Sequence, residues 1–276
     1  MKILKILKIL KTLKILALLV SSLFLMSAGY AEDSGLLWLV NLKNTLEATY
    51  RPQKLINING YQMHPEAGEA FLKMLDAMEV DGIENLRMCS AYRPYRYQKA
   101  LFDEKKRLLC GLGYDKEEAE RIAARSVAVP GASEHQLGLA VDVSVTGRLN
   151  VHFGTTEAGI WLAGNCHKYG YIIRYPKDKT EITKIIYEPW HLRYVGVPHA
   201  GFMKELDLCL EEYIDFVKDA GILLYWLDDE RYYKVSYCPG DVPRLQPVSE
   251  NFSISSIGPR DSAGYIITEL KQTYTT

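Results

Sequence analysis

The segment LGLAVDVSV at residues 137–145 constrains the fold more than any other part of the chain. Bulky apolar side chains alternate in it with small or polar ones, which is the pattern of a β-strand with one buried face. Asp142 falls on the face opposite the valines, between the small residues Ala140 and Ser144. Gly138 separates the strand from His135. The sequence therefore predicts a core strand that carries a carboxylate, with a histidine just before a bend of the chain.

Helices and further strands surround this segment. Residues 65–79 place apolar side chains on one helical stripe, and helices are also expected at 97–109, from 115 and at 157–169. The runs YIIRYP and EITKIIY predict a hairpin-like pair of strands, and residues 199–221 predict one long amphipathic helix. Because helices and strands are mixed without repeated βαβ alternation, we expect an α+β fold in which helices flank a mainly antiparallel central sheet.

The two ends of the chain differ from its middle. Residues 1–31 combine five lysines, an apolar run and small residues at Gly29 and Ala31, as a secretory signal peptide does. An uncleaved anchor or an amphipathic surface helix is the alternative, because the KIL repeat makes the basic part unusually long. Short aromatic runs beyond about residue 221 indicate a small β-rich module. We therefore predict a signal peptide at 1–31, a main domain at 32–220 and a C-terminal β appendage at 221–276.

The charge balance excludes one class of partner. Five of the 33 lysines and arginines lie in the predicted signal peptide, which leaves 28 against 34 acidic residues and a formal charge of −6. Binding to nucleic acid through a general basic surface is therefore not expected. The five cysteines are too scattered for a zinc knuckle or a disulfide framework.

Two polar segments together suggest a metal site. Taken alone, His135 and Asp142 fit a hydrogen-bonded core histidine and a turn-capping aspartate. The segment YEPWHLRYVG adds Glu188 and His191. Two histidines and a carboxylate form the three-ligand shell of a catalytic zinc ion, with a fourth position for water. Glu188 then stands where a general base for that water is needed.

A third segment, SAYRPYRYQ, could supply substrate contacts. Arg93 offers a planar fork of donors for a carboxylate or a developing oxyanion, and Gln98 follows it by about one helical turn. Taken alone, such an arginine is more often a structural or surface ion-pair residue, and Ser133 is most simply a turn residue. The HExxH signature of the common zinc proteases is missing, so the ligands of any zinc ion must come from separate strands and loops.

The three segments occur in an order that resembles a known family. SAYRPYRYQ, SEHQLGLAVDVS and YEPWHLRYVG look like the motifs of the VanY-type zinc D-alanyl-D-alanine carboxypeptidases, which read SxHxxGxAxD and ExWHxRYVG in the last two. The likeness extends to LVN near residue 39, IRYP around Tyr175 and LCLEEY at 208–213, and so spans roughly residues 36–215. It implies a Hedgehog-like peptidase fold and hydrolysis of peptidoglycan stem peptides.

Carried over position by position, the resemblance implies a role for each polar residue of the motifs. One zinc ion would be bound by His135, Asp142 and His191, with Glu188 as catalytic base. Arg93 would polarise the scissile carbonyl and hold substrate, and further substrate contacts would be Gln98, Ser133 and Tyr175. Many relatives have serine or threonine at the position of Pro94, a departure that leaves the role of Arg93 intact. The remaining histidines match no motif and are assigned to structure or surface: His64, His152, His167 and His199.

The resemblance thus implies a secreted or envelope-bound zinc metallo-carboxypeptidase that removes the terminal D-alanine from peptidoglycan stems, as a monomer. Membrane contact is expected only through the N-terminal segment, if it is not cleaved. Two alternatives stay open: an L,D-carboxypeptidase acting on tetrapeptide stems, and a non-catalytic zinc-containing wall-binding module on the same fold. A serine-type carboxypeptidase is set aside, because the sequence has no SxxK, SDN or KTG motif.

Overall fold

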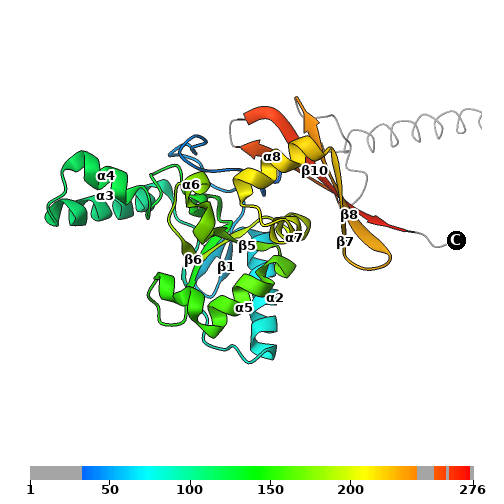
Figure 1. Cartoon of the computed structure of the whole chain (residues 1–276), viewed down its shortest axis with the longest axis horizontal. Helices are drawn as coiled ribbons and strands as arrows, with labels where there is room; N and C mark the ends of the chain where they lie inside the picture. Colours follow the sequence, from blue (N-terminus) through cyan, green and yellow to red (C-terminus); the bar gives the residue numbers. More distant parts are fainter. Residues whose placement is uncertain (1–32, 241–251, 259–260, 274–276) are drawn as a thin grey trace, which may run out of the picture.

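The computed structural model describes residues 33–240, 252–258 and 261–273 (Figure 1). Two four-stranded antiparallel sheets and one short hairpin contain the described strands. Helices pack around the first sheet and between it and the second (Figure 1). The expected α+β class with antiparallel sheets is confirmed. The predicted signal peptide at 1–31 lies outside the described residues.

The central sheet has the strand order β3-β4-β6-β5. Its strands are β3 (Arg87–Ser90), β4 (Ala140–Ser144), β5 (Tyr171–Tyr175) and β6 (Glu188–Tyr194). Every residue of β4 is buried, and Val141 and Val143 join the main core as their alternation predicts. The register sets Asp142 directly opposite His191, a pairing that joins the two polar segments of the sequence.

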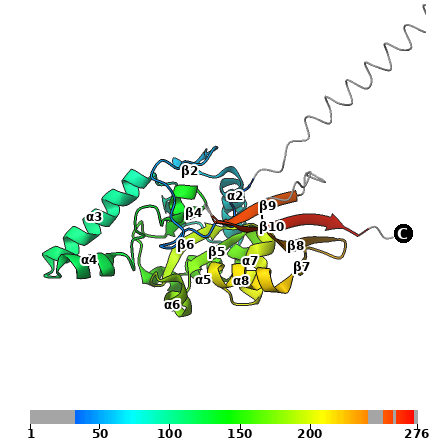
Figure 2. The same cartoon turned by 90° about the horizontal axis from the view of Figure 1, so that it is seen from above.

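Helices cover this sheet and extend from it. The core beside the sheet is filled mainly from α2 (Pro65–Val80) and α5 (Glu157–Asn165), with the hairpin β1 (Ile56–Ile58) and β2 (Tyr61–Met63) next to α2. The hairpin of α3 (Tyr95–Gly111) and α4 (Lys116–Ala123) projects outward and has a small core of its own (Figure 2). The helices expected at 65–79, 97–109 and from 115 are thereby confirmed, and that expected at 157–169 ends as a 3-10 turn over Cys166–Tyr169.

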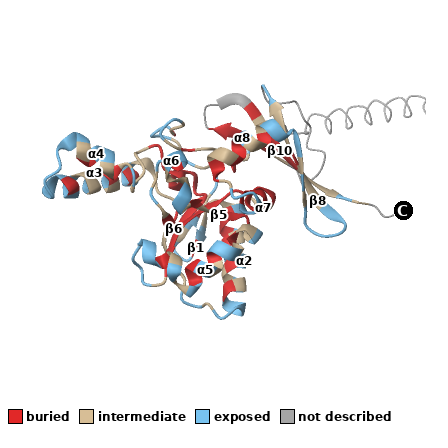
Figure 3. Ribbon diagram, viewed as in Figure 1, coloured by how far each residue is buried: buried red, intermediate tan, exposed pale blue. Residues whose placement is uncertain are grey.

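The second sheet has the order β7-β8-β10-β9. It consists of β7 (Ile222–Trp226), β8 (Arg231–Pro239), β9 (Phe252–Gly258) and β10 (Asp261–Gln272). One face packs on α7 (Val197–Glu205) and α8 (Leu210–Ala220) in a second hydrophobic core (Figure 3). The β-rich character predicted for the C-terminal part is confirmed, while the domain limits stay predictions.

Two expected elements take another form. The run EITKIIY is no strand: α6 (Thr180–Thr183) occupies its first half, and β5 pairs with β6 instead. The Thr183 hydroxyl donates to the Lys179 carbonyl and accepts from the Ile185 amide, so it closes a turn in which Lys184 has a φ of 63°. The long helix predicted at 199–221 is two helices, α7 and α8, with a break at which Asp207 has a φ of 53°. Within the described residues, no helix has the length and apolar character needed to cross a membrane.

Candidate metal centre

A glycine turn brings His135 next to β4. His135 belongs to a short 3-10 turn, Glu134–Leu137, which ends at Gly138 with a φ of 73°. A Cβ at position 138 would lie 2.8 Å from Leu55 Cδ2 and 3.1 Å from the His64 backbone nitrogen. Glycine is thus required both for the left-handed backbone and for the close approach of the hairpin. The bend that the sequence predicts here is confirmed.

Three of the predicted residues form a buried cluster. His135, Asp142 and His191 offer ligand atoms that lie within 4.8 Å of one another. His135 Nε2 is 3.2 Å from Asp142 Oδ2, and His191 Nδ1 is 2.9 Å from Asp142 Oδ1. His135 Nδ1 is 2.7 Å from the Ala91 carbonyl oxygen. Because a carbonyl oxygen only accepts, Nδ1 carries the proton, and the lone pair of Nε2 points into the cluster.

The electrostatics of this cluster favour a positive charge. Burial, reinforced by Arg93, lowers the pKa of His135 to about 4, so its imidazole is neutral near pH 7. Burial opposes ionisation of Asp142, but the two histidines hold its pKa well below the usual value. Burial would likewise keep His191 neutral, but the hydrogen bond to Asp142 and the nearby Glu134 carboxylate raise its pKa to about 9. In a protein without bound metal, a proton on His191 supplies the positive charge that a metal ion would supply in its place.

Glu188 and Arg93 flank the cluster. Glu188 Oε2 is 3.9 Å from His191 Nδ1, and burial, with help from Asp142, raises the pKa of Glu188 to about 7. Arg93 Nη2 is 3.7 Å from Asp142 Oδ2, and the Arg93 amide donates to the His135 carbonyl at 3.1 Å. A carboxyl group that titrates near neutral pH can both take and return a proton, and a guanidinium beside it can hold an anionic group.

One cavity of about 460 Å³ collects all the predicted site residues. Tyr175 is nearly fully buried in its wall, with its ring centroid 5.0 Å from that of His191. Gln98 fixes another wall by donating to the Ala128 carbonyl at 2.7 Å. The predicted residues that line the cavity are Arg93, Gln98, Ser133, His135, Asp142, Tyr175, Glu188 and His191. Segments far apart in sequence therefore meet as the motifs suggest.

Three buried charged residues behind the cluster escaped prediction from the sequence. Glu134, Arg174 and Arg193 are each at most 1% exposed. Each one lies inside a segment that the resemblance covers, and Arg174 and Arg193 lie within strands whose neighbouring residues are apolar. A charge inside a buried strand signals a buried partner, because an unpaired charge there is very unfavourable. The sequence alone did not indicate which residue that partner is.

The donor set fits zinc. Zinc binds histidine nitrogen and carboxylate oxygen atoms at about 2 Å in a tetrahedral arrangement, which places these ligand atoms roughly 3.3 Å apart. The separation of 3.2 Å between His135 Nε2 and Asp142 Oδ2 suits that arrangement. The His135 Nε2 atom is also buried without a hydrogen-bond partner. Three protein ligands beside an open cavity leave a position for water or substrate.

Comparison with known proteins connects this site with a family. A family model described as VanY, D-alanyl-D-alanine carboxypeptidase, matches residues 60–197. The chain is 42% identical over 196 residues to the putative carboxypeptidase YodJ of Bacillus subtilis, covering 66% of this chain and 68% of YodJ. It is 39% identical to a D-alanyl-D-alanine carboxypeptidase of Enterococcus faecalis, covering 65% of this chain and 66% of that protein.

Solved structures give the same result. A mutant of the vancomycin resistance D,D-pentapeptidase VanY in complex with Zn(II) matches with a TM-score of 0.59 and 40% identity, over 64% of this chain and 98% of that one. VanYB in complex with D-alanine-D-alanine matches with a TM-score of 0.60 and 38% identity, over 66% and 98%. The LD-carboxypeptidase LdcB matches with a TM-score of 0.58 and 39% identity, over 68% and 93%. The resemblance seen in the three sequence motifs is confirmed, and the chain belongs to the VanY family of D-alanyl-D-alanine carboxypeptidases.

Proposed function

We propose that the protein is a zinc-dependent D-alanyl-D-alanine carboxypeptidase that hydrolyses the terminal D-alanine from peptidoglycan stem peptides. The observation that carries this proposal is the convergence of a buried His-Asp-His cluster, a carboxyl group and a guanidinium on one cavity. A relative named D-alanyl-D-alanine carboxypeptidase supports the substrate class, and the similar VanY structures solved with Zn(II) and with D-alanine-D-alanine support both the metal and the substrate class.

Zinc would be held by His135, Asp142 and His191. At such a site zinc would make a water molecule acidic enough to react near neutral pH and would withdraw charge from the scissile carbonyl. Glu188 takes a proton as the water oxygen bonds to the carbonyl carbon. It then returns that proton to the amide nitrogen, so that the carbon–nitrogen bond breaks and D-alanine leaves as the free amino acid. The raised pKa of Glu188 suits both steps.

Arg93 and the cavity walls would hold the substrate. The Arg93 guanidinium faces the cavity beside Asp142, so it can polarise the scissile carbonyl and stabilise the oxyanion that develops there. Gln98, Ser133 and Tyr175 line the same cavity and would contact the peptide. The Gln98 Oε1 atom is buried without a hydrogen-bond partner, which leaves an acceptor available for a peptide N–H.

An L,D-carboxypeptidase acting on tetrapeptide stems is the second candidate. It is favoured by one observation, the similarity to the LD-carboxypeptidase LdcB, which is as high as the similarity to the VanY structures. Both activities would use the same metal and the same base. Their difference must lie in how the cavity accepts the residue before the scissile bond.

The proposal also covers the cellular location of the protein and its division into domains. The signal-like composition of residues 1–31 supports an activity in the cell envelope, with this segment as the export signal or anchor. Residues 32–220 would form the catalytic domain of a monomer. The β-rich part from 221 would be its C-terminal appendage.

Mass spectrometry of the purified protein with UDP-muramyl-pentapeptide and, separately, with the tetrapeptide tests this function. We expect loss of one alanine from the pentapeptide, abolished by a chelator and restored by zinc. Loss from the tetrapeptide alone would move the assignment to the L,D activity. If zinc-loaded protein cleaved neither, the non-catalytic wall-binding alternative would replace the enzyme.

A further inference from the structure

Glu134 lies behind the metal cluster in an almost solvent-free position. Its Oε1 atom accepts a hydrogen bond from Arg174 Nε at 2.8 Å and forms an ion pair with Arg193 Nη1 at 2.7 Å. Two guanidinium groups held against one oxygen match the charge of a carboxylate at this position, and that oxygen is fully engaged.

The other oxygen faces a metal ligand. Glu134 Oε2 is 3.8 Å from His191 Nε2. Both atoms are buried, and neither has a hydrogen-bond partner. Buried polar atoms are rarely left without a partner, so two such atoms that face each other form a natural donor and acceptor pair. An ionised carboxylate only accepts, which requires the proton to be on His191 Nε2.

We propose that Glu134 is a positioning residue that fixes the tautomer and orientation of His191 for metal binding. With the proton held on Nε2 by Glu134, the lone pair of His191 is on Nδ1, the atom that lies 2.9 Å from Asp142 and 3.9 Å from Glu188. The two histidines would then bind through different nitrogens, Nε2 of His135 and Nδ1 of His191. This inference rests on the metal site of the proposed function and adds to it a residue that touches neither metal nor substrate.

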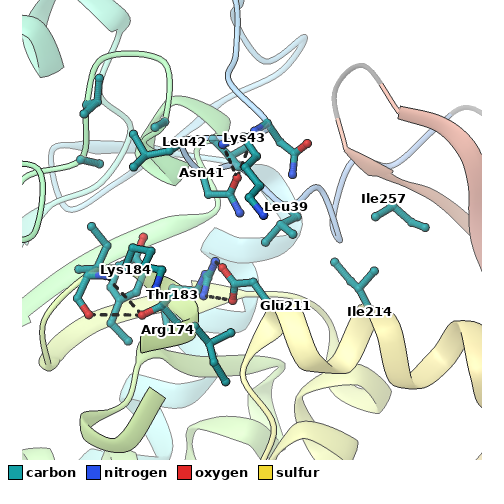
Figure 4. Close-up of a pocket in the computed structure, with 18 of the residues that line it drawn as sticks. Leu39, Asn41, Leu42, Lys43, Arg174, Thr183, Lys184, Glu211, Ile214 and Ile257 are labelled. Carbon is teal, nitrogen blue, oxygen red and sulfur yellow. Dashed lines mark hydrogen bonds and ion pairs between the residues drawn. The ribbon is translucent and has the colours of Figure 1, made fainter. Parts of the chain in front are cut away.

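The surrounding charges explain why Glu134 can hold this orientation. Arg174 donates to Glu211 through both terminal nitrogens, at 2.8 and 2.7 Å, in the wall of a neighbouring cavity of about 450 Å³ (Figure 4). Arg193 donates from Nη2 to the Leu36 carbonyl at 2.9 Å. Contacts away from Glu134 therefore hold each guanidinium in place, and its position relative to Glu134 Oε1 is fixed. The carboxylate cannot rotate without losing both arginines, so Oε2 stays directed at His191.

Glu134→Gln is the informative substitution. The two arginines require an oxygen at the Oε1 position, so the amide group of glutamine must place its NH₂ where Oε2 was. That NH₂ donates to His191 Nε2 and forces the ring proton onto Nδ1, the nitrogen assigned to the metal. Glu211→Gln is the matched control, because it removes one carboxylate from the same buried network. Within the described contacts, Glu211 interacts with Arg174 and does not touch His191.

Zinc affinity, measured on the full chain by competition with a chromogenic chelator, tests the inference without any substrate. Loss of a group that orients a metal-bound histidine typically costs about 10–100-fold in metal affinity, and we expect a loss of this size for Glu134→Gln. Glu211→Gln should lose clearly less, because its amide oxygen still accepts from Arg174 and the Glu134 carboxylate stays in place. Equal zinc affinity in wild type and Glu134→Gln, or equal losses in both variants, would overturn the role of Glu134.

Nitrogen NMR of the imidazole rings in zinc-loaded wild-type protein provides a second measurement that does not depend on a variant folding. We expect His191 to carry its proton on Nε2 and His135 on Nδ1. A His191 proton on Nδ1 would contradict the inference. If the wild type bound no zinc at all, the proposed function itself would fail, which is an outcome distinct from unchanged affinity in Glu134→Gln.

Discussion

Glu188 and His191 lie three residues apart on β6, yet their substitutions should fail in different ways. Glu188→Gln removes the proton acceptor but none of the three expected ligands, so the zinc content should stay at one per chain. Loss of a general acid–base group typically lowers the rate by about 10²–10⁴-fold, and we expect kcat on the pentapeptide to fall by this amount. His191→Ala is the contrasting variant, which should lose zinc as well. Metal analysis beside kcat distinguishes the two, and zinc loss in Glu188→Gln would contradict the assigned role.

Gly138 permits a test of the turn that positions His135. Gly138→Ala should destabilise the protein, because alanine at a φ of 73° is strained by about 1–2 kcal/mol and its Cβ would also meet Leu55 and the His64 backbone. Gly147 has a φ of 79°, but a Cβ added there would meet no atom within 4 Å, so it shares the strain without the contact. Urea unfolding of both alanine variants should show the larger loss at Gly138. Equal losses would mean that packing at this turn does not matter.

The residues of the site divide into those that sequence could suggest and those that it could not. His135, Asp142 and His191 stand out because three polar segments share one order and one chemistry, and the register of β4 and β6 then brings the last two together. Glu134 could not be singled out, because its partners Arg174 and Arg193 are 40 or more positions away. Which buried charges form pairs depends on the fold, because no local sequence pattern indicates the partner.

Helices and strands could be predicted where hydrophobic periodicity and packing agree, as for α2 and β4. The prediction failed where local polar contacts determine the backbone instead of the hydrophobic pattern. The apolar residues of EITKIIY have strand spacing, but Ile182 and Ile186 are exposed, so no core selects the strand. The predicted helix at 199–221 is divided because the Glu212 side chain accepts from the Cys209 amide and begins a new helix there. Hydrophobic periodicity continues across both helices and does not reveal the break.

Gly201 within α7 offers a test of how this helix meets the second sheet. Glycine to alanine in a helix interior normally stabilises by about 1 kcal/mol. A Cβ at Gly201 would however lie 2.3 Å from the Tyr225 ring on β7, so Gly201→Ala should destabilise the protein instead. Gly164→Ala in α5, where nothing lies within 4 Å, is the control and should be neutral or stabilising. The denaturation midpoint should fall for Gly201→Ala and stay level or rise for Gly164→Ala, and a gain at Gly201 would show that the sheet moves freely on α7.

At the scale of the whole molecule, the C-terminal sheet is joined to α7 and α8 through a buried polar contact as well as through apolar packing. His199 on α7 lies with its Nδ1 atom 2.7 Å from the Tyr213 hydroxyl of α8 and its Nε2 atom 3.1 Å from the Thr268 hydroxyl of β10. A neutral imidazole satisfies this arrangement by accepting from one hydroxyl and donating to the other. The histidine assigned to structure by the sequence thus links the last helices of the main part to the C-terminal sheet.

This contact predicts that the packing of the C-terminal sheet on α7 and α8 becomes less stable in acid. Burial lowers the pKa of His199 to about 3, whereas the unfolded chain has the ordinary value near 6.5. At a pH between these two pKa values, His199 is protonated in the unfolded chain but neutral in the folded protein. The free energy of unfolding therefore keeps the full contribution of His199 above pH 6.5 and loses up to about 1.4 kcal/mol per unit as the pH falls below it.

His199→Gln isolates that contribution, because an amide can replace the hydrogen bonds but does not titrate. Urea unfolding of both proteins from pH 7.5 to pH 5, with a chelator present so that metal binding does not vary, gives the two pH profiles. The variant should be the less stable protein at pH 7.5, since its side chain fits the contact less well. Its deficit should shrink by about 2 kcal/mol between pH 7.5 and pH 5, because only the wild type loses the histidine contribution. Parallel profiles would mean that His199 takes up its proton without disturbing the junction between the helices and the C-terminal sheet.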